Sequence, residues 1–438
     1  MIKLRHFTVV LLIVSGILHV NAQNKADSLL DAYFSVAGID RIKAMYLALE
    51  ALKAARTAND RHNEAVALEC IGVQHYYRGN YREATKYLSE AENIYRNEKS
   101  YRGLASVYNN LGLVEQDLGN YPRAIACFSY ALINDDVSGD STGRALTLSN
   151  LGTVYLYKGQ YSRAKQYFEH ALRIGQQTGN AEVKGNALNN LGLVYLDALR
   201  FDSALMLFRQ ARLLADAEND LYGLTIARIN EAMALAGLNL TDSAARCFDE
   251  IFPAIEALND PDLEMEYLIH LSELALQLKE YNLALQKLLF AQKINNRLEQ
   301  KKKSAEIFRR MGSALARLQN VESALAYLHL SRNIAFDCGI MPELAATYGE
   351  LSLAHGVNKE YDSAKYYMEK FAKLRSQILF AEPDSTLSAG LNPLVKTERP
   401  GNLKMFLRIG ISLALFWLLL LFFMRLARKK RKAENKVT

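Results

Sequence analysis

Small and large apolar residues recur along this chain with a period of forty residues. One phase of the period carries Gly72, Gly112, Gly152, Gly192 and Gly312, with Ala232, Ser272 and Ser352 at its remaining positions. Twelve residues after each of these stands an alanine, from Ala84 to Ala364 without exception. A fixed period of this length predicts a solenoid of stacked two-helix units, because each unit buries its apolar face only against its neighbours.

The glycine phase has a physical reason inside such a unit. A glycine within a helix costs about 1 kcal/mol relative to alanine, so its repeated use indicates the close approach of a second helix. We expect the alanine twelve residues on to form that close surface. Gly79, Gly119 and Gly159 fall where the first helix should end and suit a left-handed cap. Aromatic residues two positions later should fill the wedge between the two helices; they are Tyr81, Tyr121, Tyr161, Phe201, Tyr281 and Tyr361.

The unit Leu151-Gly152, Tyr155, Gly159-Gln160-Tyr161, Ala164, Phe168 and Ala171 resembles the tetratricopeptide repeat, a helix-turn-helix motif of about 34 residues. The resemblance implies an all-α fold, a right-handed α-solenoid of eight repeats over residues 60–379, with a degenerate helical cap over 23–59. The additional residues fall at the junctions between units, where longer helices, longer loops or both would accommodate them. HEAT-like arrays also run near forty residues and are the alternative, although they do not predict the glycine and alanine phases.

The two ends of the chain carry targeting signals. Residues 1–22 combine a basic start, an apolar run and Val20-Asn21-Ala22, which is typical of a cleaved signal peptide; an uncleaved anchor is the alternative. A flexible linker over 380–403 precedes an apolar run at 404–424, which is long enough for a transmembrane helix. The basic tail at 425–438 predicts a cytoplasmic end. These signals predict a single-pass protein of the bacterial inner membrane with its solenoid in the periplasm.

Charge and composition narrow the function further. The formal net charge of +6 resides in the two ends, so the body between them is nearly neutral and offers no surface for nucleic acid. The four cysteines do not form a disulfide set, since Cys127 and Cys247 occupy one phase three units apart. Neither a metal-ligand spacing nor a nucleophile or phosphate-binding motif is present. We therefore expect no enzyme activity and no cofactor.

A row of asparagines is the candidate binding site. In the tetratricopeptide family the residue before the Leu-Gly pair faces the concave groove, and this phase reads Cys70, Asn110, Asn150, Asn190, Asn230, His270, Arg310 and Glu350. Asn109 and Asn189 widen the row one position earlier. An amide both donates and accepts hydrogen bonds, so the resemblance implies a grip on the backbone of an extended peptide. The alternative is a solvated polar row without a ligand.

Two functions are consistent with this organisation. The first is an exported, membrane-anchored scaffold that binds a peptide or protein partner in its groove. The second is a sensory component of signal transduction, because the order of signal peptide, repeats, membrane helix and basic segment resembles the sensory half of bacterial membrane-bound regulators. In that case the kinase or DNA-binding output is lost or supplied by a separate partner. A eukaryotic type I membrane protein, with the single sequon at Asn239, is a third option.

Overall fold

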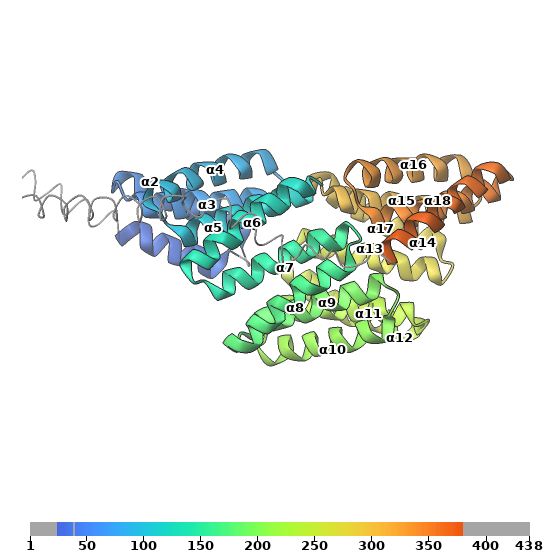
Figure 1. The fold of residues 1–438 in the computed structure, drawn as a ribbon, viewed down its shortest axis with the longest axis horizontal. Helices are drawn as coiled ribbons and strands as arrows, with labels where there is room; N and C mark the ends of the chain where they lie inside the picture. The colour runs from blue at the N-terminus through green and yellow to red at the C-terminus, as the bar shows by residue number, and fades with distance from the viewer. Residues whose placement is uncertain (1–23, 38–39, 380–438) are drawn as a thin grey trace, which may run out of the picture. The chain divides into compact units, whose positions relative to one another are not determined.

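The computed structural model describes residues 24–37 and 40–379, and every regular element in these ranges is a helix (Figure 1). A helix over residues 24–36 and α2 (Arg41–Thr57) precede the repeats. The first helices of the eight units are α3 (Arg61–Tyr77), α5 (Tyr101–Asp117), α7 (Ser141–Tyr157), α9 (Ala181–Asp197), α11 (Leu221–Gly237), α13 (Pro261–Gln277), α15 (Lys301–Arg317) and α17 (Met341–Val357). The second helices are α4 (Tyr81–Glu98), α6 (Tyr121–Ser138), α8 (Tyr161–Thr178), α10 (Phe201–Ala217), α12 (Thr241–Leu258), α14 (Tyr281–Leu298), α16 (Val321–Asp337) and α18 (Tyr361–Leu379).

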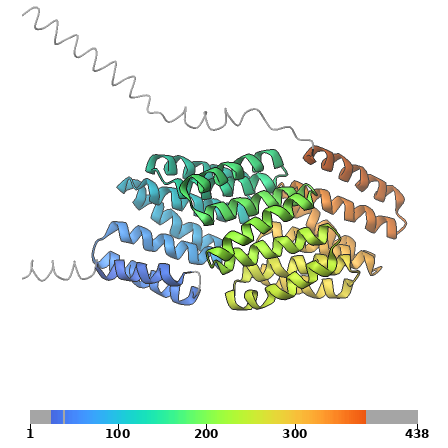
Figure 2. The same cartoon turned by 90° about the horizontal axis from the view of Figure 1, so that it is seen from below.

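Each unit, counted from residue 60 in steps of forty, is one antiparallel helix pair stacked on the next (Figures 1 and 2). The first helices have 17 residues and α4, α6 and α8 have 18, with only two or three residues between consecutive helices. The residues beyond the usual tetratricopeptide length therefore lengthen the helices rather than the loops. Aspartates cap several first helices, because Asp60, Asp140 and Asp220 accept a hydrogen bond from the backbone three residues on.

The periodic glycines make room for a large side chain of the second helix. A β-carbon on Gly112 or Gly152 would lie 2.5 or 2.6 Å from the ring of Phe128 or Phe168, sixteen residues later. At Gly72 the corresponding atom is Leu88 Cγ, at 2.8 Å, and the backbone oxygen of Ala84 follows at 3.3 Å. The partner expected from the sequence, the alanine twelve residues on, is thus a farther contact than the leucine at Gly72, and at Gly112 and Gly152 the three nearest atoms all belong to the phenylalanine.

The turn between the two helices of every unit contains one residue with left-handed backbone. Gly79, Gly119 and Gly159 have φ of +73°, +78° and +71°, which confirms their predicted role as helix caps. The later units place larger residues at this position, namely Leu199, Asn239, Lys279, Gln319 and Lys359. The aromatic two residues on is buried at Tyr81 and Tyr121, but Tyr361 in the last unit is 70% exposed.

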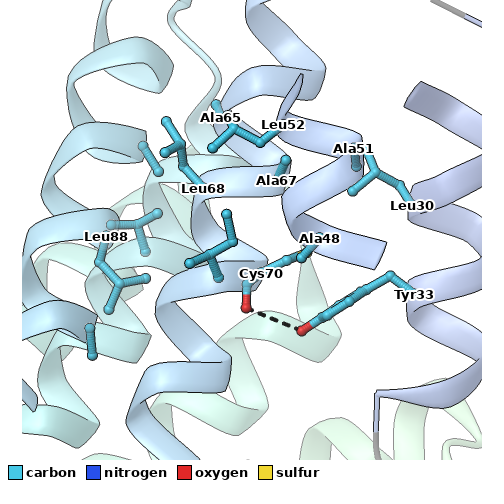
Figure 3. Close-up of a cluster of buried hydrophobic side chains, with 14 of the residues drawn as sticks. Leu30, Tyr33, Ala48, Ala51, Leu52, Ala65, Ala67, Leu68, Cys70 and Leu88 are labelled. Atoms are coloured by element: carbon cyan, nitrogen blue, oxygen red, sulfur yellow. Dashed lines mark hydrogen bonds between the residues drawn. The ribbon is translucent and has the colours of Figure 1, made fainter. Parts of the chain in front are cut away.

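Hydrophobic packing runs continuously from the N-terminal helices into the first units (Figure 3). Leu30 and Tyr33 of the helix over residues 24–36 lie beside Ala51 and Ala48 of α2, and the same cluster reaches Leu88 of α4. The Tyr33 hydroxyl donates to the Cys70 carbonyl at 3.4 Å. The N-terminal helical pair therefore covers an end of the array that would otherwise expose an apolar face.

Several predictions concern residues outside the described ranges: the signal peptide at 1–22, the linker at 380–403, the membrane helix at 404–424 and the tail at 425–438. Among the helices of residues 24–379, none is both long and apolar enough to cross a membrane. All four cysteines are free thiols, as the sequence predicted.

Gly152→Ala should destabilise the array, whereas Gly185→Ala should not. The new methyl group at position 152 would overlap the Phe168 ring, and overpacking of this kind costs about 1–3 kcal/mol. Gly185 lies inside α9, and a β-carbon there would have no atom within 4 Å, so alanine should stabilise by up to about 1 kcal/mol. Urea unfolding followed by circular dichroism measures both changes. Equal midpoints for the two variants would contradict the packing role of Gly152.

Candidate functional site

Two cavities lie along the inner face of the array. The larger, which we call the first-unit cavity, has a volume of about 740 Å³. It is lined by the N-terminal helices, by α3 and α5, and by residues near Asp260. Its lining residues include Tyr33, Arg41, Val73, Tyr77, Asn110 and Tyr222. The second, called the central cavity, has about 480 Å³ and is lined mainly by the first helices α9, α11, α13 and α15. Both volumes are in the range that binds small ligands or part of a peptide. The sequence predicted this inner face correctly as the side of the first helices.

A network of ion pairs forms one wall of the central cavity. Glu266 contacts Lys303, and Glu306 contacts both Lys302 and Lys303. In the neighbouring part of the wall, Arg309 Nε donates to Glu343 at 2.6 Å and Arg310 Nε donates to Glu273 at 2.8 Å. Charges removed from water are tolerated only when they are paired in this way, so the network fixes the first helices of units six to eight relative to one another.

The pKa values of the wall follow from burial and pairing. Burial opposes ionisation of Glu266 and Glu306, but the ammonium groups of Lys302 and Lys303 prevail and hold both pKa values well below their usual range. Burial raises the pKa of Asp197 and of Asp262, which also line the central cavity, to about 6. The Lys302 ammonium partly offsets the effect of burial on the pKa of Asp197.

Three buried polar atoms of the central cavity have no hydrogen-bond partner among the described residues: Tyr161 Oη, His270 Nδ1 and Arg310 Nη1. Arg310 is only 8% exposed, and its Nη1 has just a loose ion pair with Glu306 at 3.9 Å. His270 uses its other nitrogen to contact Glu266 at 3.1 Å. Buried polar groups without partners are costly, so these three atoms are suited to a ligand that brings hydrogen-bonding groups into the cavity.

The predicted asparagine row is present, but its members bond to one another. Asn150 donates to the Asn109 carbonyl at 2.8 Å, and Asn230 donates to Asn189 in the same way at 2.8 Å. Asn110 donates to Glu69 at 3.2 Å. These bonds tie α5, α7 and α11 each to the preceding first helix, so part of the amide capacity serves the stacking of units. Asn189 and Asn230 line the central cavity, Asn110 lines the first-unit cavity, and Asn190 is half-buried in α9.

Sequence reasoning missed the residues that come from distant units. Tyr157 of α7 lies under Lys302 of α15, whose ammonium is 4.7 Å from the ring centroid. Asp197, Tyr222 and Asp262 also reach the cavities from the ends of first helices. Tyr222, Asp262 and Lys302 are spaced by forty residues and therefore occupy the same position in successive units. The superhelical turn of the array, which brings them opposite units three and four, is not visible in any local sequence pattern. Leu193 and Met233, which follow Asn190 and Asn230 by three residues, line the central cavity with apolar side chains.

Comparison with known proteins identifies the repeat. A model of the tetratricopeptide repeat matches three overlapping segments, residues 63–132, 103–177 and 143–217. No curated protein matches the sequence.

Solved structures resemble the whole array. A Rap protein complexed with Competence and Sporulation Factor aligns over 81% of this chain and 99% of its own, with 13% identity and a TM-score of 0.62. The Rap conjugation gene regulator of the plasmid pLS20, in complex with the Phr* peptide, covers 83% and 99% with 13% identity and a TM-score of 0.53. Aspartyl phosphate phosphatase F from Bacillus subtilis covers 81% and 94% with 13% identity and a TM-score of 0.50. At these identities the likeness concerns the fold.

Asp197→Asn should stabilise the protein at pH 7.5 and leave it unchanged near pH 4. The buried carboxylate has a folded-state pKa of about 6 against an ordinary value of 3.8, so stability is lost as pH rises through this interval. The neutral amide removes that loss, for a gain of about 1–3 kcal/mol above pH 7. Urea unfolding at both pH values measures the gain.

The matched control is Asp249→Asn on the exposed side of α12, which removes the same charge away from the cavity. A gain from Asp197→Asn that is equal at pH 4 and pH 7.5 would show that burial of this carboxylate is not its cause.

Proposed function

Since residues 63–217 carry tetratricopeptide repeats, we propose that the chain is an exported, membrane-anchored scaffold that binds a peptide or protein partner on its inner face. The observation that carries the proposal is the central cavity, in which buried donors and acceptors are left for a partner. The proposal assigns no catalytic step and no cofactor to the chain.

The chemistry of the cavity suits a peptide segment. Leu193 and Met233 offer apolar surface beside the amides of Asn189 and Asn230. An amide that donates to its neighbour keeps acceptor capacity, and Arg310 Nη1 adds a donor. A peptide backbone presents alternating donors and acceptors together with side chains, so it can meet both kinds of surface at once. Two of the structurally similar proteins were solved with a bound factor or peptide, which supports this class of ligand.

Export and anchoring rest on the ends of the chain. The apolar run at 404–424 and the basic residues after it provide a single membrane span with a cytoplasmic tail, and residues 1–22 direct the repeats across the membrane. The alternative function is a sensory component whose output is supplied by another protein. A sensory component would bind its ligand on the same inner face. The two functions differ in whether this binding changes the activity of a partner protein on the cytoplasmic side.

Photocrosslinking in the full chain tests the binding site. We expect p-benzoylphenylalanine at position 193, inside the central cavity, to attach covalently to a peptide or protein in native membranes. The same residue at position 336, which is 67% exposed on α16, is the matched control. Mass spectrometry of the two adducts then identifies what each position contacts. Identical adducts at both positions, or none at position 193, would contradict the proposal.

The asparagine row is tested in the same assay. Asn189→Ala with Asn230→Ala should reduce the adduct at position 193 several-fold, because both amides line the central cavity. Asn110→Ala with Asn150→Ala removes the same number of amides from units two and three, outside that cavity, and should have a smaller effect. Circular dichroism confirms that both variants remain helical. Equal losses would mean that the row acts through the stacking of units.

Export predicts a mature N-terminus at Gln23. N-terminal sequencing of the membrane-bound protein identifies this residue, and protease added to spheroplasts should digest the repeats but leave the tail after residue 424. A protein that retains residues 1–22, or whose repeats are protected, would contradict the predicted topology.

A further inference from the structure

The turns inside the first units lie against the helix ends of units five steps further along the chain. Gly79 of unit one meets the backbone of Arg297 and Leu298 in unit six, and Gly119 of unit two meets Cys338 in unit seven. Gly159 of unit three meets Ile378 in unit eight. Arg41 of α2, before unit one, forms an ion pair with Asp260 at the start of unit six; the two atoms are 2.6 Å apart and the residues are separated by 219 positions. We call this row of four contacts the seam.

The seam leaves no space for a side chain at Gly79 and Gly119, and little at Gly159. A β-carbon on Gly79 would collide with the Arg297 carbonyl oxygen. On Gly119 it would lie 2.5 Å from Cys338 Sγ and 2.9 Å from Cys338 Cβ, and on Gly159 it would lie 3.2 Å from Ile378 Cγ1. By contrast, Gly139 and Gly179, which have the same left-handed backbone at junctions between units, have no atom within 4 Å of this position.

Turn geometry alone does not account for glycine at these three positions. The same turn in units four to eight has a left-handed residue with a side chain, for example Leu199 at φ of +59° and Lys279 at +64°. Glycine therefore occupies this turn in units one to three, where a later unit covers it, and is replaced in units four to eight.

The contacts across the seam are few compared with those along the array. The hydrophobic cluster of the first units draws on residues 29–118, and that of the later units draws on residues 205–327. Between the two sides the structure provides the Arg41–Asp260 ion pair, the glycine contacts and, nearby, the stacking of Lys302 on Tyr157. Both sides also contribute to each cavity, since Tyr222 and Asp260 line the first-unit cavity together with Tyr33 and Arg41.

We propose that Gly79, Gly119 and Gly159 form a docking surface for the chain's own units six to eight, and that this docking closes the array around its cavities. The later helix ends contact the backbone of the turn itself, so only a residue without a side chain permits this docking. The helices on each side of the seam are held by hydrophobic clusters of that side, so loss of the seam opens the array without unfolding its units. Opening separates the two walls of each cavity and gives a ligand a path to the inner face.

Gly119→Ala tests the docking surface, with Gly179→Ala as the matched control. Both substitutions place alanine on left-handed backbone, but only position 119 is covered. We place p-acetylphenylalanine at positions 123 and 337, which are exposed and lie on the two sides of the Gly119 contact, and attach a ketoxime spin label to each. The distance between the two labels, measured by electron–electron double resonance in the full chain, shows whether the seam is closed. We expect a single short distance in the parent and in Gly179→Ala, and a loss of at least half of that population in Gly119→Ala.

Rescue separates docking from a general loss of structure. Cys338→Gly removes both atoms that the new methyl group would meet, so the Gly119→Ala/Cys338→Gly double variant should recover the short distance. Circular dichroism should show equal helix content in all variants. A short distance that persists unchanged in Gly119→Ala overturns the proposal, as does equal opening in Gly179→Ala or an absence of rescue. These outcomes do not depend on any ligand, so they are independent of the proposed peptide binding.

Discussion

The close contact between a glycine on the first helix and a large side chain on the second is the constraint on which the rest of the structure depends. In units two to four the ring of Phe128, Phe168 or Phe208 lies where a β-carbon of the glycine would be. The contact sets the spacing of the pair, whose two helices are 17 and 18 residues long. Because all eight units have the same length, small rotations between units add up regularly, and the first helices form a continuous inner face.

Polar residues of that inner face both join successive units and line the cavities. Hydrogen bonds such as Asn150 to Asn109 and Asn230 to Asn189 join successive first helices, so polar residues take part in stacking. The ion pairs of units six to eight do the same with charges, and the pKa of Glu306 falls because two lysines face it despite its burial. Residues that stabilise the stack thus also shape the cavity, and only atoms such as Arg310 Nη1 remain for a ligand.

The features that could be predicted from the sequence are those decided within one forty-residue period. The two-helix unit, the left-handed turn at Gly119 and the inner face near Asn230 follow from residues within one period, where local chemistry decides the structure. The pairing of Lys302 with Tyr157 joins positions 145 residues apart, and it depends on the accumulated rotation of several units. The alanine twelve residues after the glycine was expected to be its partner, but the nearest atoms belong to the Leu or Phe sixteen residues on, because a side chain that points at the glycine reaches closer than the backbone of the alanine.

The seam has a consequence for how such a chain can evolve. An open solenoid can gain or lose an internal unit by recombination, since each remaining unit still meets an equivalent neighbour. In this chain, deletion of one unit between the third and the sixth would bring Gly119 opposite Ile378 instead of Cys338 and leave Gly159 without a covering helix end. The number of units between the two sides is therefore constrained as strictly as the residues within a unit. Duplication, the ordinary source of length variation in repeat proteins, is confined to the parts of the array that lie outside the paired turns.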